Sequence, residues 1–167
     1  MTVMLSCWRI AADTPDYTAD DLSGTGAKVT GGRWNRVGIP VLYASSSISL
    51  AYLETLIHLG AGGLPMNRYL VQINIPIGVW KAAKEFDPAT HVGWDAIPTG
   101  KVSLDFGDKW VASKSSALLK VPSVIVPQDR NFVINPAHPD AAGITATKLQ
   151  KWTYDGRLAA AALVPKK

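Results

Sequence analysis

Gly31-Gly32-Arg33-Trp34-Asn35, then Leu42-Tyr43-Ala44-Ser45, then Leu53-Glu54-Thr55 form the most informative segment of this 167-residue chain. The paired glycines favour a loop, because glycine adopts backbone angles that other residues avoid. The apolar run 41–44 is typical of a buried strand. The segment therefore predicts a loop, a strand and a helix in succession, which carry a cation, a phenol and a carboxylate.

The helix that carries Glu54 has start and stop signals of its own. Ser45, Ser46 and Ser47 offer side-chain oxygens that can cap the first turn of a helix. We expect this helix to run to about Leu59, where Gly60 provides a stop.

Outside this segment, the hydrophobic pattern predicts mostly strands. We expect strands at 5–10 and 69–75, a hairpin whose arms are 123–126 and 132–135, and a final strand around Trp152 and Tyr154. Helices are expected from 83–85 onward and over 108–119, and a loop over 13–32. Together these elements predict one α+β domain over residues 1–167, with a mixed, largely antiparallel sheet and flanking helices.

The composition favours a folded protein of the cytoplasm. Apolar residues make up 47% of the chain and charged residues 18%, which excludes a disordered tail. The net charge of +4 suits an anionic ligand. The chain has no run of five like charges, so nucleic-acid binding is not favoured. Cys7 is the only cysteine, so no intrachain disulfide can form. We expect neither a signal peptide at 1–10 nor a membrane span.

Glu54 is the strongest candidate for a functional residue. Its helical neighbours three and four residues away are Leu50, Ala51, Ile57 and His58, so its own face is mostly apolar. A carboxylate on such a face must be paired or line a cleft, because burying an unpaired charge costs several kcal/mol. Two interpretations are open at this point: a structural ion pair with Arg33 or Arg36, and a catalytic carboxylate.

Arg33 and Tyr43 have similar alternatives. After two glycines, the Arg33 guanidinium could hold phosphate or ribose oxygens, or it could stack on Trp34 as a structural residue. Tyr43 could be a core residue or offer its ring to a flat ligand.

Other sites are not indicated. His58, His91 and His138 lie far apart and lack metal-ligand spacing, so no metal is expected. The glycines at 24 and 26 do not fit a nucleotide-binding fingerprint, because position 29 is Val.

An ordered set of short motifs strongly resembles the RES domain, over residues 5 to about 158. The set comprises Trp8-Arg9-Ile10, Gly24, Gly26-Ala27, Gly31-Gly32-Arg33-Trp34-Asn35, Leu42-Tyr43, Leu53-Glu54, Val121-Pro122-Ser123, Asn131, Asn135-Pro136, His138-Pro139 and Asp155-Gly156-Arg157-Leu158. The resemblance implies a fold like that of ADP-ribosyltransferases and a growth-arresting toxin of a type II toxin–antitoxin system. It also implies an Xre-type helix-turn-helix antitoxin as partner, a homodimer within the toxin–antitoxin complex, and DNA contact only through the antitoxin.

The resemblance also implies site residues and a substrate. Glu54, Arg33 and Tyr43 would be catalytic, and Arg9, Arg33, Tyr43, Ser123 and Asn135 would bind NAD, which is a substrate rather than a cofactor. Nicotinamide is a cationic leaving group, so a carboxylate near its ribose can stabilise the positive charge that develops there. Arg33 and Arg9 would hold the pyrophosphate or a ribose, Tyr43 would stack near nicotinamide, and Ser123 and Asn135 would orient the substrate.

Several functions remain open at this point. The leading hypothesis is an enzyme that cleaves NAD at the nicotinamide–ribose bond with water or phosphate as acceptor, and so depletes the NAD of the cell. A protein mono-ADP-ribosyltransferase is the first alternative, because only the acceptor differs. A non-catalytic binding module and a ribonuclease toxin are the others, although the three histidines do not favour an acid–base pair.

Overall fold

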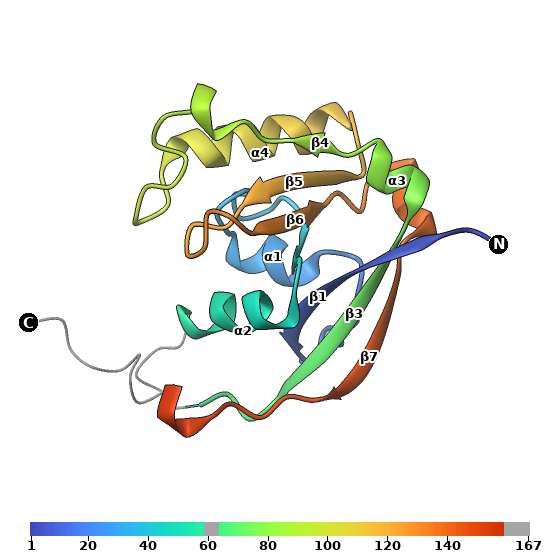
Figure 1. Cartoon of the computed structure of the whole chain (residues 1–167), viewed down its shortest axis with the longest axis vertical. Coiled ribbons are helices and arrows are strands. Elements are labelled where there is room, and N and C mark those ends of the chain that lie inside the picture. The colour runs from blue at the N-terminus through green and yellow to red at the C-terminus, as the bar shows by residue number, and fades with distance from the viewer. Residues whose placement is uncertain (59–63, 159–167) are drawn as a thin grey trace, which may run out of the picture.

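The computed structural model describes residues 1–58 and 64–158, which fold around one seven-stranded sheet (Figure 1). The strand order is β4-β5-β6-β2-β1-β3-β7. In chain order the elements are β1 (Met4–Ala12), α1 (Thr25–Thr30), β2 (Leu42–Ser45), α2 (Ile48–Leu56), β3 (Arg68–Pro76), α3 (Ile77–Lys81), β4 (Lys84–Glu85), α4 (Lys101–Ser113), β5 (Leu118–Pro122), β6 (Arg130–Ile134) and β7 (Thr145–Lys151). Only β4 and β5 pair in parallel, so the predicted mixed, largely antiparallel sheet is confirmed.

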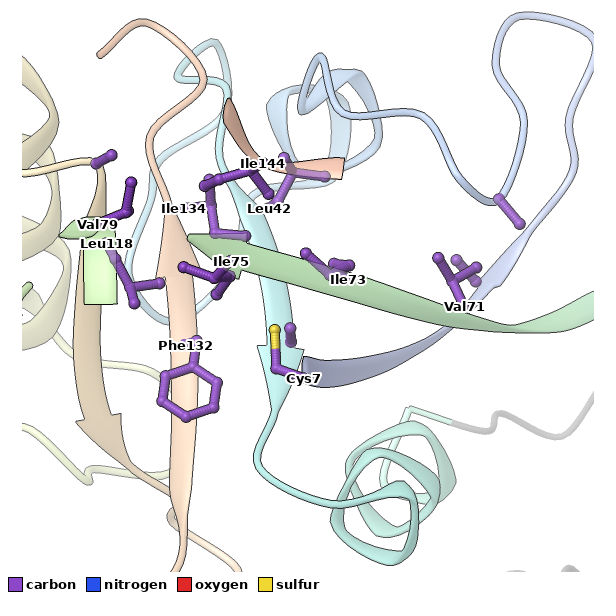
Figure 2. Packing of buried hydrophobic residues seen from close by; sticks show 14 residues of the cluster. Cys7, Leu42, Val71, Ile73, Ile75, Val79, Leu118, Phe132, Ile134 and Ile144 are labelled. Carbon is purple, nitrogen blue, oxygen red and sulfur yellow. The ribbon is translucent and has the colours of Figure 1, made fainter. Parts of the chain in front are cut away.

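Side chains alternate between the two faces of the sheet, and each face has its own core. One face, which we call the Cys7 face, carries a continuous cluster that includes Cys7, Leu42, Ile73, Phe132 and Ile134 (Figure 2). Twelve residues of this cluster are at most 4% exposed; they are Cys7, Ala19, Leu42, Ala44, Val71, Ile73, Ile75, Ala117, Leu118, Phe132, Ile134 and Ile144.

The opposite face, which we call the Tyr43 face, carries two separate clusters. Trp110 of α4 packs there with Leu119 and Val133 of β5 and β6. Ala51 of α2 packs with Ile10 and Leu70 of β1 and β3. Because β2 lies between β6 and β1, it separates the half of the face that α4 covers from the half that α2 covers.

The elements expected from local pattern are present, with adjusted ends. The strand expected at 5–10 is the longer β1, the run 41–44 is β2, and 69–75 is β3. Helix α2 begins where the serines predict it, since the Ser47 hydroxyl accepts a 3.1 Å hydrogen bond from the Leu50 N–H. It ends at Leu56, before the expected end; Leu59 and Gly60 lie outside the described residues.

The hairpin before the C-terminus exists, but its first arm is not 123–126. The antiparallel pair is β5 with β6, and the residues after Pro122 form the connecting turn. Ser123 starts this turn, because its hydroxyl accepts hydrogen bonds from the N–H groups of Ile125 and Val126, both at 3.1 Å.

Four other expectations were wrong in whole or in part. The segment 13–32 contains the short helix α1, and the predicted helix at 83–85 is the edge strand β4. The helix expected over 108–119 is α4, which ends at Ser113 where Lys114 adopts a left-handed φ of 50°. The last strand is β7, which stops before Trp152; Trp152 and Tyr154 pack instead on Tyr52 of α2, with ring centroids 5.4 Å away in each case.

Two further features concern the described residues as a whole. None of their helices combines the length and the apolar character that a membrane crossing requires. They also hold no group of three or more His, Cys, Asp or Glu side chains that could bind a metal ion.

Candidate active site

The loop that carries Arg33 is fixed against helix α4. Gly107 of α4 lies so close to the loop that a Cβ there would be 1.8 Å from the Trp34 carbonyl oxygen. The Arg36 guanidinium binds both Asp105 and Asp108 on the same helix. These hydrogen bonds hold the pKa of Asp105 below its usual range. The loop is therefore held by a close backbone contact and by ion pairs.

Tyr43, which lies on β2, hydrogen-bonds to the same loop. Its hydroxyl donates to the Asn35 side-chain oxygen at 2.6 Å and accepts from the Trp34 N–H at 3.0 Å. Gly32 must be glycine here, because a Cβ would lie 2.7 Å from that hydroxyl. Burial raises the pKa of Tyr43, so the phenol stays protonated. Tyr43 thus joins β2 to the loop through its hydroxyl, and the residue is half-buried.

Arg33 is half-buried and points toward a second loop. One terminal nitrogen of its guanidinium donates to the backbone carbonyls of Trp94 at 2.9 Å and Ala96 at 3.0 Å. Burial lowers the pKa of Arg33, whereas the charges of Asp95 and Glu54 act in the opposite direction. Arg33 and Glu54 do not form an ion pair within the described residues.

Glu54 is held by hydrogen bonds rather than by an arginine. Its Oε1 accepts from the Ser123 hydroxyl at 2.8 Å and from the Asn131 side-chain amide at 2.6 Å. The structural ion pair considered from sequence is absent from the described residues, since Arg36 is engaged by α4. Oε2 has no hydrogen-bond partner within residues 1–58 and 64–158, and the side chain is partly exposed.

The carboxylate lies where β2 separates the two clusters of the Tyr43 face. Ser45 of β2 pairs with Asn131 of β6 in the sheet, and its hydroxyl donates to the Asn131 side-chain oxygen at 2.7 Å. Cross-strand partners share a face, so Tyr43, Ser45 and Asn131 all lie on the Tyr43 face. Hydrogen bonds join Glu54 to Ser123 and Asn131, Tyr43 lies two residues from Ser45 on the same face of β2, and the charge of Glu54 acts on Arg33.

Arg9 is not brought to this face. Trp8 pairs with Ser45, so the next residue along β1 points to the Cys7 face, where it is paired with Val71. Burial lowers the pKa of Arg9, and the titratable groups that oppose this effect are first Asp21, then Tyr17 and Cys7, not Glu54.

Asn135 also lies away from Glu54. It follows the end of β6 that is distant from Asn131, about 13 Å further along an extended chain. Its amide is fully buried and bonded to backbone: it donates to the Val111 carbonyl at 3.1 Å and accepts from the Ala137 N–H at 3.0 Å. The structure therefore places Asn131, rather than Asn135, beside the carboxylate.

Ser45 and Asn131 are the site residues that sequence reasoning missed. Asn131 was among the motifs that carry the family resemblance but was given no site role, and Ser45 was considered only as a helix cap. Their contact joins residues 86 positions apart, so only the strand register shows that the two side chains meet.

The Glu54 side chain is half-buried at the surface of the described chain. Two pockets of the described chain lie elsewhere: one of about 310 Å³ borders Leu42 and His138, and another borders Pro76 and Val79. Chemically, the site offers a carboxylate with one free oxygen beside a guanidinium and a phenol ring. This arrangement can stabilise positive charge on a sugar carbon and hold an anion next to it.

Comparisons with known proteins identify the family of the chain. A family model described as the RES domain matches residues 6–156. A protein of Sphingobium sp. named "Prs ADP-ribosylating toxin" is 58% identical over 154 residues, which cover 92% of this chain and 96% of that protein.

More distant relatives carry the name "Toxin Res". The one from Pseudomonas putida is 37% identical over 153 residues, which cover 90% of this chain and 97% of the relative. The one from Yersinia enterocolitica is 38% identical over 143 residues, covering 85% and 93%. Since both the family model and these relatives match most of its length, the chain belongs to the RES domain family.

Proposed function

We propose that this protein is a toxin that consumes NAD by breaking the bond between nicotinamide and ribose. The observation that supports this most directly is the Glu54 carboxylate, which is anchored through Oε1 and open at Oε2, beside Arg33 and Tyr43. The relatives' names, which describe toxins and in one case an ADP-ribosylating toxin, support the same function.

The proposed chemistry needs few groups. The C–N bond breaks and nicotinamide leaves as a neutral base with the bonding electron pair, so no general acid is needed. Glu54 stabilises the positive charge on the ribose carbon and accepts a hydrogen bond from a ribose hydroxyl. Arg33, which has donors beyond the one bonded to Trp94 and Ala96, holds an NAD phosphate. The Tyr43 ring lies against nicotinamide.

Arg9 and Asn135 have no place in this proposal as ligands of NAD. Arg9 belongs to the Cys7 face, and the amide of Asn135 is bonded to backbone on both sides. Their proposed roles are structural.

The acceptor of ADP-ribose is proposed from the relatives. The 58% identical relative is named for ADP-ribosylation of Prs, which favours transfer to a side chain of that protein over transfer to water or phosphate. In either case the acceptor oxygen or nitrogen bonds to the ribose carbon, and its proton passes to solvent.

An antitoxin is the proposed partner, because the RES domain family comprises toxins of toxin–antitoxin systems. An Xre-type helix-turn-helix antitoxin and a toxin homodimer complete this proposal. Size measurements on the co-expressed pair would test both.

The deciding experiment measures NAD consumption by the protein freed of any antitoxin. Wild type is incubated with NAD, with and without purified Prs, and products are resolved by mass spectrometry. We expect the wild type to release nicotinamide and Glu54→Gln to release none. Glu85→Gln, whose carboxylate is exposed on β4, should release nicotinamide at the wild-type rate. Added mass on Prs would identify transfer, and free ADP-ribose would identify hydrolysis. Intact NAD under every condition would refute the proposal.

A further inference from the structure

Both hydrogen bonds to the Glu54 carboxylate end on the same oxygen. Ser123 donates from the turn after β5 and Asn131 from the start of β6, and both reach Oε1. A carboxylate with two donors on one oxygen cannot rotate without losing them, so its two oxygens are not equivalent. Oε2 is the one left for another donor.

Ser123 has no hydrogen-bonding capacity left for a substrate. A hydroxyl has one proton and two lone pairs. Its proton goes to Glu54, and its oxygen accepts from the N–H groups of Ile125 and Val126. The residue is also completely buried. Ser123 therefore acts through Glu54 and not by contact with NAD.

The orientation of the Asn131 amide follows from the chemistry of its neighbours. An ionised carboxylate only accepts hydrogen bonds, so the Asn131 nitrogen must face Glu54. The amide oxygen then faces Ser45, whose hydroxyl must donate to it at 2.7 Å. Ser45 is 4% exposed, so water does not readily replace this donor. Without Ser45, the amide is free to turn its oxygen toward the carboxylate and repel it.

We propose that Ser45 and Asn131 are positioning residues which, together with Ser123, present Oε2 of Glu54 to the ribose of the substrate. The identity of that substrate rests on the proposed function above; the positioning of Glu54 does not. The hydrogen-bonded series joins β2, β6 and α2, the three elements that meet at the centre of the Tyr43 face.

Kinetic variants test the positioning role. Hydrogen bonds to charged groups have energies that correspond to about 10- to 100-fold in rate, so Asn131→Ala should lower kcat by that factor. KM for NAD should change less than about twofold, because Arg33 and Tyr43 are untouched. A raised KM with a normal kcat would overturn the proposal, since it would make Asn131 a substrate ligand.

Variants of Ser45 distinguish a role in hydrogen bonding from a role in packing alone. Ser45→Ala should lower kcat about 10-fold, and Ser45→Thr should recover most of it, because threonine keeps the hydroxyl donor. If Ser45 served only to fill space at this buried position, the smaller alanine would be tolerated better than the larger threonine. An active alanine variant beside an impaired threonine variant would therefore contradict the proposal.

The chain contains a matched control for this pair. The Ser6 hydroxyl donates to the Asn74 side-chain oxygen at 3.0 Å, in the same sheet but on the exposed part of β1 and β3. Ser6→Ala and Asn74→Ala remove an equivalent serine–asparagine hydrogen bond. Both should leave kcat and KM unchanged.

A spectroscopic measurement separates this proposal from the proposed function. The side-chain NH₂ signals of Asn131 are followed by ¹H–¹⁵N NMR in wild type, Ser45→Ala, Glu54→Gln and Ser6→Ala. We expect shifts in the Ser45 and Glu54 variants and none in the Ser6 variant. If the Asn131 NH₂ signals keep their wild-type positions in Ser45→Ala, the positioning role is refuted, whatever the activity of the variant. Shifts as expected in a protein that leaves NAD intact would support the positioning of Glu54 and refute only the proposed function.

Discussion

Replacing Gly107 with alanine tests how strictly helix α4 fixes the loop that carries Arg33. The new Cβ would stand 1.8 Å from the Trp34 carbonyl oxygen, whereas a carbon–oxygen contact needs about 3.3 Å. The loop must therefore move by about 1.5 Å, and Arg33 is the residue next to Trp34. A shift of about 1 Å in a positioned group can lower a rate by about 100-fold, so we expect kcat to fall at least that far.

The cost in stability should be much smaller than the cost in activity. Forcing a methyl group into a packed contact destabilises by about 1–3 kcal/mol, whereas alanine is favoured over glycine in a helix by about 1 kcal/mol. The net loss of about 1 kcal/mol should lower Tm by about 2–4 °C in a domain of this size. Thermal unfolding and NAD consumption, measured on the same preparation, check both expectations.

Gly78 is the matched control for Gly107. It lies in helix α3, and a Cβ there would meet nothing within 4 Å. Gly78→Ala should therefore keep the wild-type kcat and keep or slightly raise Tm. Wild-type kcat and Tm in Gly107→Ala would refute the reasoning, because they would show that the loop moves without cost to the site.

Three further predictions follow from the contacts described above. Tyr43→Phe leaves the Trp34 N–H without its acceptor, so chemical denaturation should show a loss of about 1–3 kcal/mol; an unchanged midpoint would contradict this. Burial raises the pKa of Cys7 to about 12, so a thiol reagent at pH 8 should label it only as fast as the protein unfolds, and rapid labelling of native protein would refute the burial argument. Because Arg36 lowers the pKa of Asp105, this carboxylate contributes stability above its unfolded pKa of about 3.9 and loses that contribution as pH falls through the lower folded value. Arg36→Ala should accordingly weaken the dependence of Tm on pH below about pH 4, and an unaltered dependence would rule the contribution out.

The sequence predicted those helices and strands that are determined by neighbouring residues, such as an alternating apolar pattern or a helix cap. The alternation of residues 69–75 identified β3, and the serine cap identified the start of α2. Strand β4 has no such signal, because Lys84 and Glu85 are both exposed and become a strand only by pairing with Leu119 and Lys120 of β5.

The same distinction applies to the candidate site. Arg33, Tyr43 and Glu54 lie close in sequence, and their residue types and spacing made them candidates, but the choice between a structural and a functional role came from the resemblance to the RES domain. Choosing between Asn131 and Asn135 required the register of β2 on β6, which residue types do not encode. Similarly, only the alternation of β1 between the two faces separates Arg9 from the site.

The hydrogen bonds to Glu54 also affect when a newly made chain can become active. The donors from Ser123 and Asn131 are encoded 69 and 77 residues after the carboxylate. At a translation rate of about 5–20 residues per second, the ribosome needs about 4–15 s to add this interval. A nascent chain that ends before Asn131 has the carboxylate but not the groups that orient it. Assembly of the site is thereby deferred until residue 131 has been made and can pair with the strands that precede it in the chain.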